Sequence, residues 1–277
     1  RPLERLVKDS IDWQMLHKNA ENGTLSGVIV TALDIATGRT TMFAEVGRGR
    51  IFRPSRDPSR AAHPTLLDAE HILASAAFPG LFPAQRVGDH YYVDGGIRFN
   101  TPIAPAIRAG AERMVIVPTL YRRQVPRSVI KGYPSATFFL GKLINALIAD
   151  RLDYDLQVME RFNRLVEALD SVITKEERRE IDRVLVESRG ATYRQLETLI
   201  IRPSEDIGSI AGEHIRSSVR GSKGFWFKQL LKRSGSDEAD WASYVLFDGI
   251  FAERLVELGR ADSLAQSDEI LRFFDRG

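Results

Sequence analysis

The sequence of 277 residues predicts an α/β fold: a mostly parallel sheet flanked by helices, with a C-terminal helical region. Short apolar runs rich in β-branched residues alternate with segments in which apolar residues recur at helical spacing. Residues 91–120 read as strand, helix and strand, the pattern of a right-handed crossover between parallel strands. We therefore expect an α/β domain over residues 1–204 and a helical layer packed on it over residues 205–277.

The composition excludes several classes of protein. Hydrophobic residues make up 43% and charged residues 27%, as in ordinary globular domains. The 39 basic and 37 acidic residues leave a net charge of only +2, so we predict no nucleic-acid partner. Cysteine is absent and the five histidines form no H-x-H or H-x-x-x-H pair, so we predict no metal site and no cofactor. No apolar run reaches the length of a membrane-spanning helix.

The first third of the chain has its own periodic segments. Residues 3–17 carry apolar side chains on one helical face. The apolar run around 28–33 and the segment "RTTMFAEV" flank the sequence "ATG", which indicates a hairpin. Residues 47–64 are rich in glycine, proline and arginine and read as a loop. Residues 65–78 read as a helix that Thr65 could cap and that "PGLFP" ends.

The remaining elements follow from the same patterns. Residues 91–94 form a short strand, 102–110 a short helix ending at Gly110, and 112–120 a buried strand. Helical structure is predicted from 135 to 190, where the charge-rich segment "KEERREIDRVLVESRG" reads as a solvated helix face. A further strand is predicted at 195–204. Helices are predicted at 205–219, 225–233, 240–258 and 267–274.

The segment "YYVDGGIRFNTP" (91–102) places a carboxylate, Asp94, at the end of a strand. In open α/β sheets, ligands bind beyond the carboxyl ends of the strands. Gly95 and Gly96 allow a sharp turn with positive φ and the close approach of another segment. A partly desolvated carboxylate there can have a raised pKa and act as a general base. Taken alone, a D-G-G sequence more often contains a turn aspartate that binds its own backbone, so both interpretations stay open.

Several motifs together resemble the patatin-like phospholipases of bacteria. "ASAAFPGLFP" (74–83) precedes the D-G-G sequence and "NTP" (100–102) follows it. "TALDIATGR" (31–39), "IIRPSEDIGSIA" (200–211) and "SYVLFDGIFAERLVELGRADSLA" (243–265) are also similar to segments of that family. The resemblance covers most of the chain, and the block 74–117 is its most specific part.

The resemblance implies a serine lipid-acyl hydrolase that acts on a lipid or another acyl ester. In this family a serine in G-x-S-x-G attacks the ester, the aspartate of D-G-G is the base without a histidine, and a glycine-rich loop stabilises the oxyanion. Asp94 corresponds to the catalytic aspartate, and Gly95 and Gly96 to its turn. The resemblance also implies a bacterial protein located in the cytoplasm or peripherally on a membrane. It does not define the headgroup, the acyl length or the oligomeric state.

The sequence departs from the family because it contains neither G-x-S-x-G nor the G-x-G-x-x-G loop. "GTLSG" (23–27) has one residue too many before the serine. We interpret the chain as a patatin-like domain lacking its N-terminal part. The chain could be a fragment, could be complemented by a separate chain or could be a degenerate protein, and we favour the fragment. The 277 residues alone are then expected to be inactive. The alternative is a non-catalytic lipid-binding or scaffold protein on the same fold.

Three further features have competing interpretations. His90 lies four residues before Asp94 and could be imagined in a Ser-His-Asp triad, but a loop residue is favoured. Ser75 could be a nucleophile, but its alanine-rich helix without a glycine elbow favours a packing role. The segment 221–235, "GSKGFWFKQLLKRSG", interleaves aromatic and basic residues and could contact a membrane surface. A surface helix with extended lysines is its simpler interpretation.

Overall fold

A computed structural model of the chain describes residues 2–49, 52, 57–79, 82–97, 103–118, 152–189, 192, 194–218 and 249–275. The chain divides into two compact units. The first contains residues 1–113 and 150–197, and the second contains residues 114–149 and 198–277. The domain boundary that the sequence predicts between residues 204 and 205 stays a prediction.

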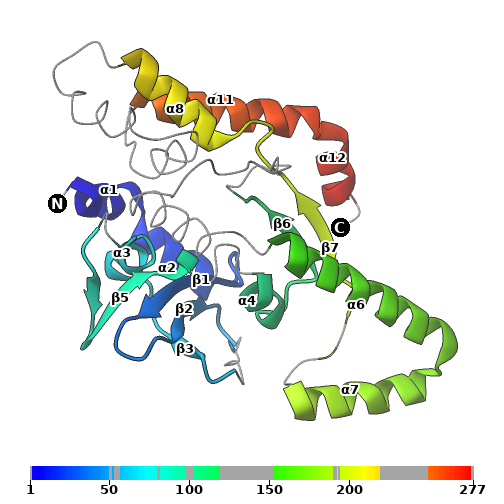
Figure 1. Ribbon diagram of the computed structural model, residues 1–277. Coiled ribbons are helices and arrows are strands. Elements are labelled where there is room, and N and C mark those ends of the chain that lie inside the picture. Colours follow the sequence, from blue (N-terminus) through cyan, green and yellow to red (C-terminus); the bar gives the residue numbers. More distant parts are fainter. Residues whose placement is uncertain are drawn as a thin grey trace, which may run out of the picture. The chain divides into compact units, whose positions relative to one another are not determined.

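The first unit contains a five-stranded sheet with the order β3-β2-β1-β5-β4 (Figure 1). Its strands are β1 (Gly27–Asp34), β2 (Thr40–Val46), β3 (Arg60–Pro64), β4 (Gln85–Val87) and β5 (His90–Asp94). Strand β1 is antiparallel to both β2 and β5, and β4 is antiparallel to β5. Only β2 and β3 run parallel among these pairs. The hairpin predicted around "ATG" is therefore confirmed.

The α/β class with flanking helices is confirmed, but the prediction of a mostly parallel sheet is wrong for these strands. Short turns join β1 to β2 and β4 to β5, and such turns can connect only antiparallel neighbours. Gly38 and Gly88 adopt positive φ values of 65° and 57° in these turns, which a glycine tolerates at no steric cost. Strand β6 (Arg113–Ile116) pairs with β7 (Glu197–Ile200), not with β5. The predicted crossover from 91–94 therefore does not close within one sheet in the described part of the chain.

Apolar side chains cover both faces of the sheet. On one face, Ala32, Phe43, Leu67, Ala74 and Tyr92 form a buried cluster, to which helix α3 (Ala69–Ser75) contributes. On the other face, Met42, Ala44 and Phe52 form a second cluster with partly buried neighbours. The alternation of side chains along β1 and β2 supplies both clusters, as expected for strands buried on both faces. The sheet is therefore the core that positions the carboxylates described below.

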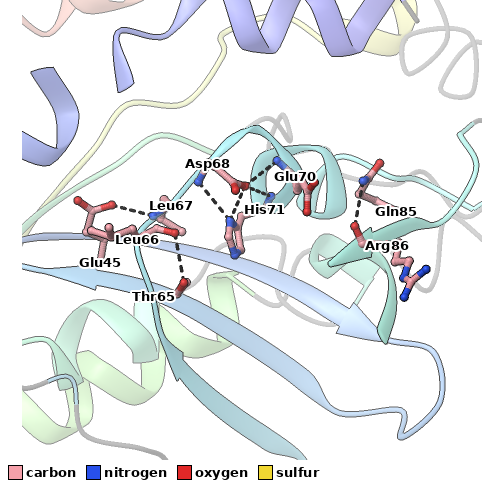
Figure 2. Close-up of polar contacts among 9 residues, drawn as sticks. All are labelled: Glu45, Thr65, Leu66, Leu67, Asp68, Glu70, His71, Gln85 and Arg86. Atoms are coloured by element: carbon pink, nitrogen blue, oxygen red, sulfur yellow. Dashed lines mark hydrogen bonds and ion pairs between the residues drawn. The ribbon is translucent and has the colours of Figure 1, made fainter. Parts of the chain in front are cut away.

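Two helix boundaries differ from the predicted ones because aspartates cap the helices. The helix predicted at 3–17 is divided into α1 (Pro2–Ser10) and α2 (Trp13–Glu21). Asp12 accepts the Met15 N–H at 2.9 Å and so starts α2. The helix predicted to be capped by Thr65 begins instead after Asp68, whose carboxylate accepts the N–H groups of the first turn of α3 (Figure 2). The hydroxyl of Thr65 donates to the Leu66 carbonyl.

The loop predicted at 47–64 ends in a strand. Residues 60–64 form β3, which pairs with β2 from Thr40↔Arg60 to Ala44↔Pro64. Proline is tolerated there because β3 is the edge strand of the sheet and Pro64 is its last residue. These five positions show no alternation of apolar and polar residues, so the glycine, proline and arginine content of the segment favours a loop.

The buried carboxylate of Glu45 on β2 connects the sheet to α2 and to the segment just before α3 through hydrogen bonds. The side chain of Glu45 is only 4% exposed, and its Oε1 lies 2.8 Å from Nδ1 of His17 on α2. Its other oxygen, Oε2, accepts the Leu67 N–H at 2.8 Å just before α3 (Figure 2). Burial of a carboxylate is tolerated when hydrogen bonds satisfy it. Glu45 therefore fixes the entry of the chain into α3.

Replacing Glu45 by glutamine is expected to lower the free energy of unfolding by about 1–2 kcal/mol, because two charge-assisted hydrogen bonds become neutral ones. Urea denaturation at pH 7 measures this change. Glu253→Gln, at an exposed position of α11 (Gly249–Ala265), is the matched control and should be neutral. Equal stability of the two variants would show that the buried carboxylate contributes no more than an exposed one.

A helical hairpin and a short helix complete the described part of the first unit. Helix α6 (Leu152–Val172) is followed by α7 (Lys175–Arg189), as predicted for 135–190. Thr174 and Glu177 form reciprocal hydrogen bonds at the start of α7. Helix α4 (Ile103–Arg108) is followed by Gly110 at φ 101°, which agrees with the predicted C-terminal glycine. Residues 135–151 of the predicted helical stretch lie outside the described residues.

The described part of the second unit consists mainly of helices. Strand β7 leads to α8 (Ile207–Ser218), and α11 is followed by α12 (Ser267–Asp275) (Figure 1). Ile210 and Ala211 of α8 pack on Phe251 of α11. The buried Asp262 accepts the Ser204 N–H at 3.0 Å and so fixes the segment before α8. The helix predicted at 225–233, and with it the segment 221–235, lies outside the described residues. Among the described helices, none is long and apolar enough to cross a bilayer.

Candidate active site

Asp94 ends strand β5 and lies against two other elements of the first unit. It pairs with Ala32 in the middle of β1. Its N–H donates to the Ala77 carbonyl at 3.0 Å, directly after α3. The strand predicted at 91–94 is thus confirmed, and its last residue is held between the sheet and the end of a helix.

The turn after Asp94 is a short 3-10 helix, Gly95–Ile97. The Gly96 N–H donates to Oδ1 of Asp94 at 2.7 Å. A Cβ on Gly95 would lie 2.3 Å from the Thr31 carbonyl oxygen, so the backbone of β1 leaves no room for a side chain. The predicted close approach is therefore real at Gly95. The predicted positive φ is wrong, because neither Gly95 nor Gly96 is among the glycines with positive φ.

The environment of Asp94 favours its protonated form. Burial raises the pKa of the Asp94 carboxyl above its usual value, and the hydrogen bond from Gly96 offsets this only in part. Its second oxygen, Oδ2, makes no hydrogen bond within the described part of the chain. A carboxylate with a raised pKa and one available oxygen can accept a proton from a neighbouring hydroxyl. The Gly96 contact is also the one expected of a turn aspartate, so geometry alone fits both interpretations.

A second buried carboxylate, Asp34, lies at the end of β1. Its Oδ1 accepts the Ala36 N–H at 2.9 Å and the Thr37 N–H at 3.3 Å. Burial by itself raises the Asp34 pKa, but these hydrogen bonds and the nearby His90 outweigh it, so the net pKa is lowered. Its Oδ2 lies 3.1 Å from Nδ1 of His90. Sequence reasoning did not single out Asp34. The segment "DIATG" nevertheless has the spacing of an aspartate that accepts hydrogen bonds from the backbone of its own turn.

His90 is not the loop residue that the sequence favoured. It is the first residue of β5, and its partner is Asp34, which precedes it by 56 residues. His90 and Asp94 are four positions apart along the extended strand, a distance of about 13 Å. A Ser-His-Asp arrangement that uses this pair is therefore unsupported.

Ser75 is the last residue of α3 and is partly buried. It lies in the helix itself, without the strand-to-helix turn that exposes a nucleophile. The motif residues 98–102 and residues 80–81 lie outside the described residues. In the described ranges, no group of histidine and acidic residues is arranged to hold a metal ion.

The described part of the first unit thus combines helices with a sheet in which a partly buried carboxylate, Asp94, ends a strand and is followed by a glycine turn. Residues 4–107 match the family model described as patatin-like phospholipase. The resemblance to the patatin-like phospholipases that the sequence motifs indicated is therefore confirmed for this segment, and the match supports a lipid hydrolase family in general. No curated protein sequence matches the chain.

Proposed function

We propose that this protein is a serine lipid-acyl hydrolase in which Asp94 is the general base and the nucleophilic serine comes from outside the 277 residues. The observation that carries the proposal is the environment of Asp94. A partly buried carboxylate of raised pKa ends a strand, is oriented by Gly96, and lies within the segment that matches the lipid-hydrolase family. A turn aspartate on the surface would have no reason to be desolvated.

The chemistry requires one proton acceptor and no histidine. The serine hydroxyl transfers its proton to the Asp94 carboxylate while its oxygen attacks the ester carbonyl. Backbone N–H groups stabilise the oxyanion as it forms. The protonated Asp94 then gives its proton to the departing alcohol, which leaves an acyl-serine. Water hydrolyses that ester while Asp94 again accepts a proton, and the free acid and the serine are released.

The sheet offers a place for the segment that carries the serine. Strand β5 pairs with β1 only at residues 32–34, whereas β2 pairs with β1 along its whole length. Within the described residues, Gly27 to Thr31 thus have a neighbouring strand on one side only. A strand added there in the direction of β1 would end beside Asp94, and open strand edges favour such additions. This geometry supports a nucleophile supplied at the end of an added strand.

The test is whether any serine in the 277 residues is a nucleophile. The purified chain should neither turn over p-nitrophenyl butyrate nor be labelled by a fluorophosphonate. Labelling of a serine in this chain, mapped by peptide mass spectrometry, would contradict an external nucleophile, and labelling at Ser75 would identify the alternative. If the chain together with the segment that carries the G-x-S-x-G serine also shows no labelling, the non-catalytic lipid-binding or scaffold interpretation is favoured instead. Contact of segment 221–235 with a membrane stays a prediction from the sequence.

A further inference from the structure

We propose that His90 and Asp34 are positioning residues for Asp94. Their contact at the beginning of β5 fixes the strand against β1, so that its last residue meets β1 at Ala32. The proposal rests on the proposed function only in taking Asp94 as the reacting carboxylate. The positioning itself is a property of the fold and can be measured without turnover.

The attachment of β5 to the rest of the sheet is short. Three residue pairs join it to β1, namely Ala32↔Asp94, Leu33↔Val93 and Asp34↔Tyr92. One further backbone hydrogen bond runs from the Ile35 N–H to the Tyr91 carbonyl, at 3.0 Å. Among the described strands, β4 pairs with β5 alone, so the β4–β5 hairpin lies at the edge of the described sheet. Because an isolated two-stranded hairpin is marginally stable, each contact between β5 and β1 affects where Asp94 lies.

Asp34 is the fixed partner of the contact with His90. Its side chain is 8% exposed and is held by two backbone N–H groups on Oδ1, which leaves Oδ2 for His90. The His90 side chain is 52% exposed, so it reaches inward from the hairpin to a preformed acceptor. Its Nδ1 can donate a hydrogen bond both as neutral imidazole of the Nδ1–H tautomer and as imidazolium. With a proton on Nδ1, the contact is a charge-assisted hydrogen bond from His90 to the Asp34 carboxylate.

Asp94 needs such an anchor because the register of β5 decides which way its carboxylate faces. A slip by one residue would turn Asp94 to the opposite face of the sheet. The strand is anchored at both ends: by the contact of His90 with Asp34 at its start, and by the Asp94 N–H on the Ala77 carbonyl at its end. The first anchor lies about 13 Å from the carboxylate, so the two residues act through the strand and not by touching substrate.

Amide hydrogen exchange of the 277-residue chain, followed by NMR, tests the proposal. In His90→Ala, the amides of Ile35 and Val93 should exchange about fivefold faster, since one partly exposed, charge-assisted hydrogen bond no longer opposes hairpin opening. His90→Asn should restore protection, because its side-chain N–H can occupy the place of Nδ1–H. His63→Ala, on the edge strand β3, is the matched control and should leave both amides unchanged.

The second measurement is the carboxyl pKa of Asp94, determined by NMR titration in the same variants. This pKa would not change if His90 only stabilised the fold without positioning Asp94. It should fall toward the usual aspartate value in His90→Ala and stay raised in His90→Asn and His63→Ala. If His90→Ala does not fold, His90→Gln, whose amide sits where Nε2 does, should show the same loss. Wild-type exchange rates and a wild-type Asp94 pKa in folded His90→Ala, or in folded His90→Gln, would overturn the proposal. The proposed function fails separately, if Asp94→Asn keeps its kcat.

Discussion

Asp94→Asn should lower kcat by about 10²–10⁴-fold in the enzyme that contains the complementing serine, because general-base catalysis typically contributes that much. Asparagine keeps the size of the side chain and can still accept the Gly96 N–H, but it cannot take the serine proton. The measurement is ester hydrolysis under saturating substrate. Asp89→Asn, at a side chain that is 96% exposed in the neighbouring turn, is the matched control and should retain full activity.

The same substitution should not destabilise the fold at neutral pH. The pKa of Asp94 is raised in the folded state. At pH values between the ordinary aspartate pKa and the raised one, the folded chain therefore binds more protons than the unfolded chain. The stability that Asp94 contributes is therefore present below the unfolded pKa and is lost as the pH rises through the folded pKa. Asparagine, which does not titrate, should remove this loss, and Tm at pH 7 should be equal or higher. A near-wild-type kcat would make Asp94 a turn residue, and failure to fold would make its role structural.

Gly95→Ala should lower the free energy of unfolding by about 3 kcal/mol, at the upper end of what overpacking typically costs. The new Cβ would lie 2.3 Å from the Thr31 carbonyl oxygen and 2.6 Å from its carbonyl carbon, both backbone atoms of the central strand. Neither atom can move without distorting β1, so the turn itself must shift. That shift carries Gly96 away from the Asp94 carboxylate, and we expect hydrolysis to fall together with stability.

Gly259→Ala is the matched control for this prediction. Gly259 lies inside helix α11 and has no positive φ, and a Cβ at this position would meet no atom within 4 Å. Alanine there should stabilise the chain by about 0.5–1 kcal/mol, since it restricts the unfolded backbone and favours the helix. Chemical denaturation of both variants compares the two glycines directly. Equal effects of the two substitutions would mean that the close approach at Gly95 relaxes easily and does not determine the turn.

The described helices and strands could largely be predicted from the sequence, but their boundaries and partners could not. Periodicity indicated the strand before Asp94, the hairpin around "ATG" and the charged helix α7. It missed β3, because five residues with little apolar alternation become a strand only when β2 offers its edge. It placed the start of α3 at the wrong residue, because Thr65 and Asp68 are equally acceptable caps locally. The hydrogen bond from the Leu67 N–H to the Glu45 carboxylate holds this residue outside the helix, which is consistent with the later start of α3.

The sequence by itself determined the candidate carboxylate and its turn, since an aspartate followed by two glycines at a strand end depends only on neighbouring residues. Only the tertiary structure decided what surrounds that turn. Thr31 excludes a side chain at Gly95, and Asp34 binds His90 across 56 residues of chain. It also decided that most strand pairs are antiparallel. Strand direction and contacts between distant residues depend on which edges meet as the apolar faces are buried, and periodicity along one segment carries no information about its neighbour.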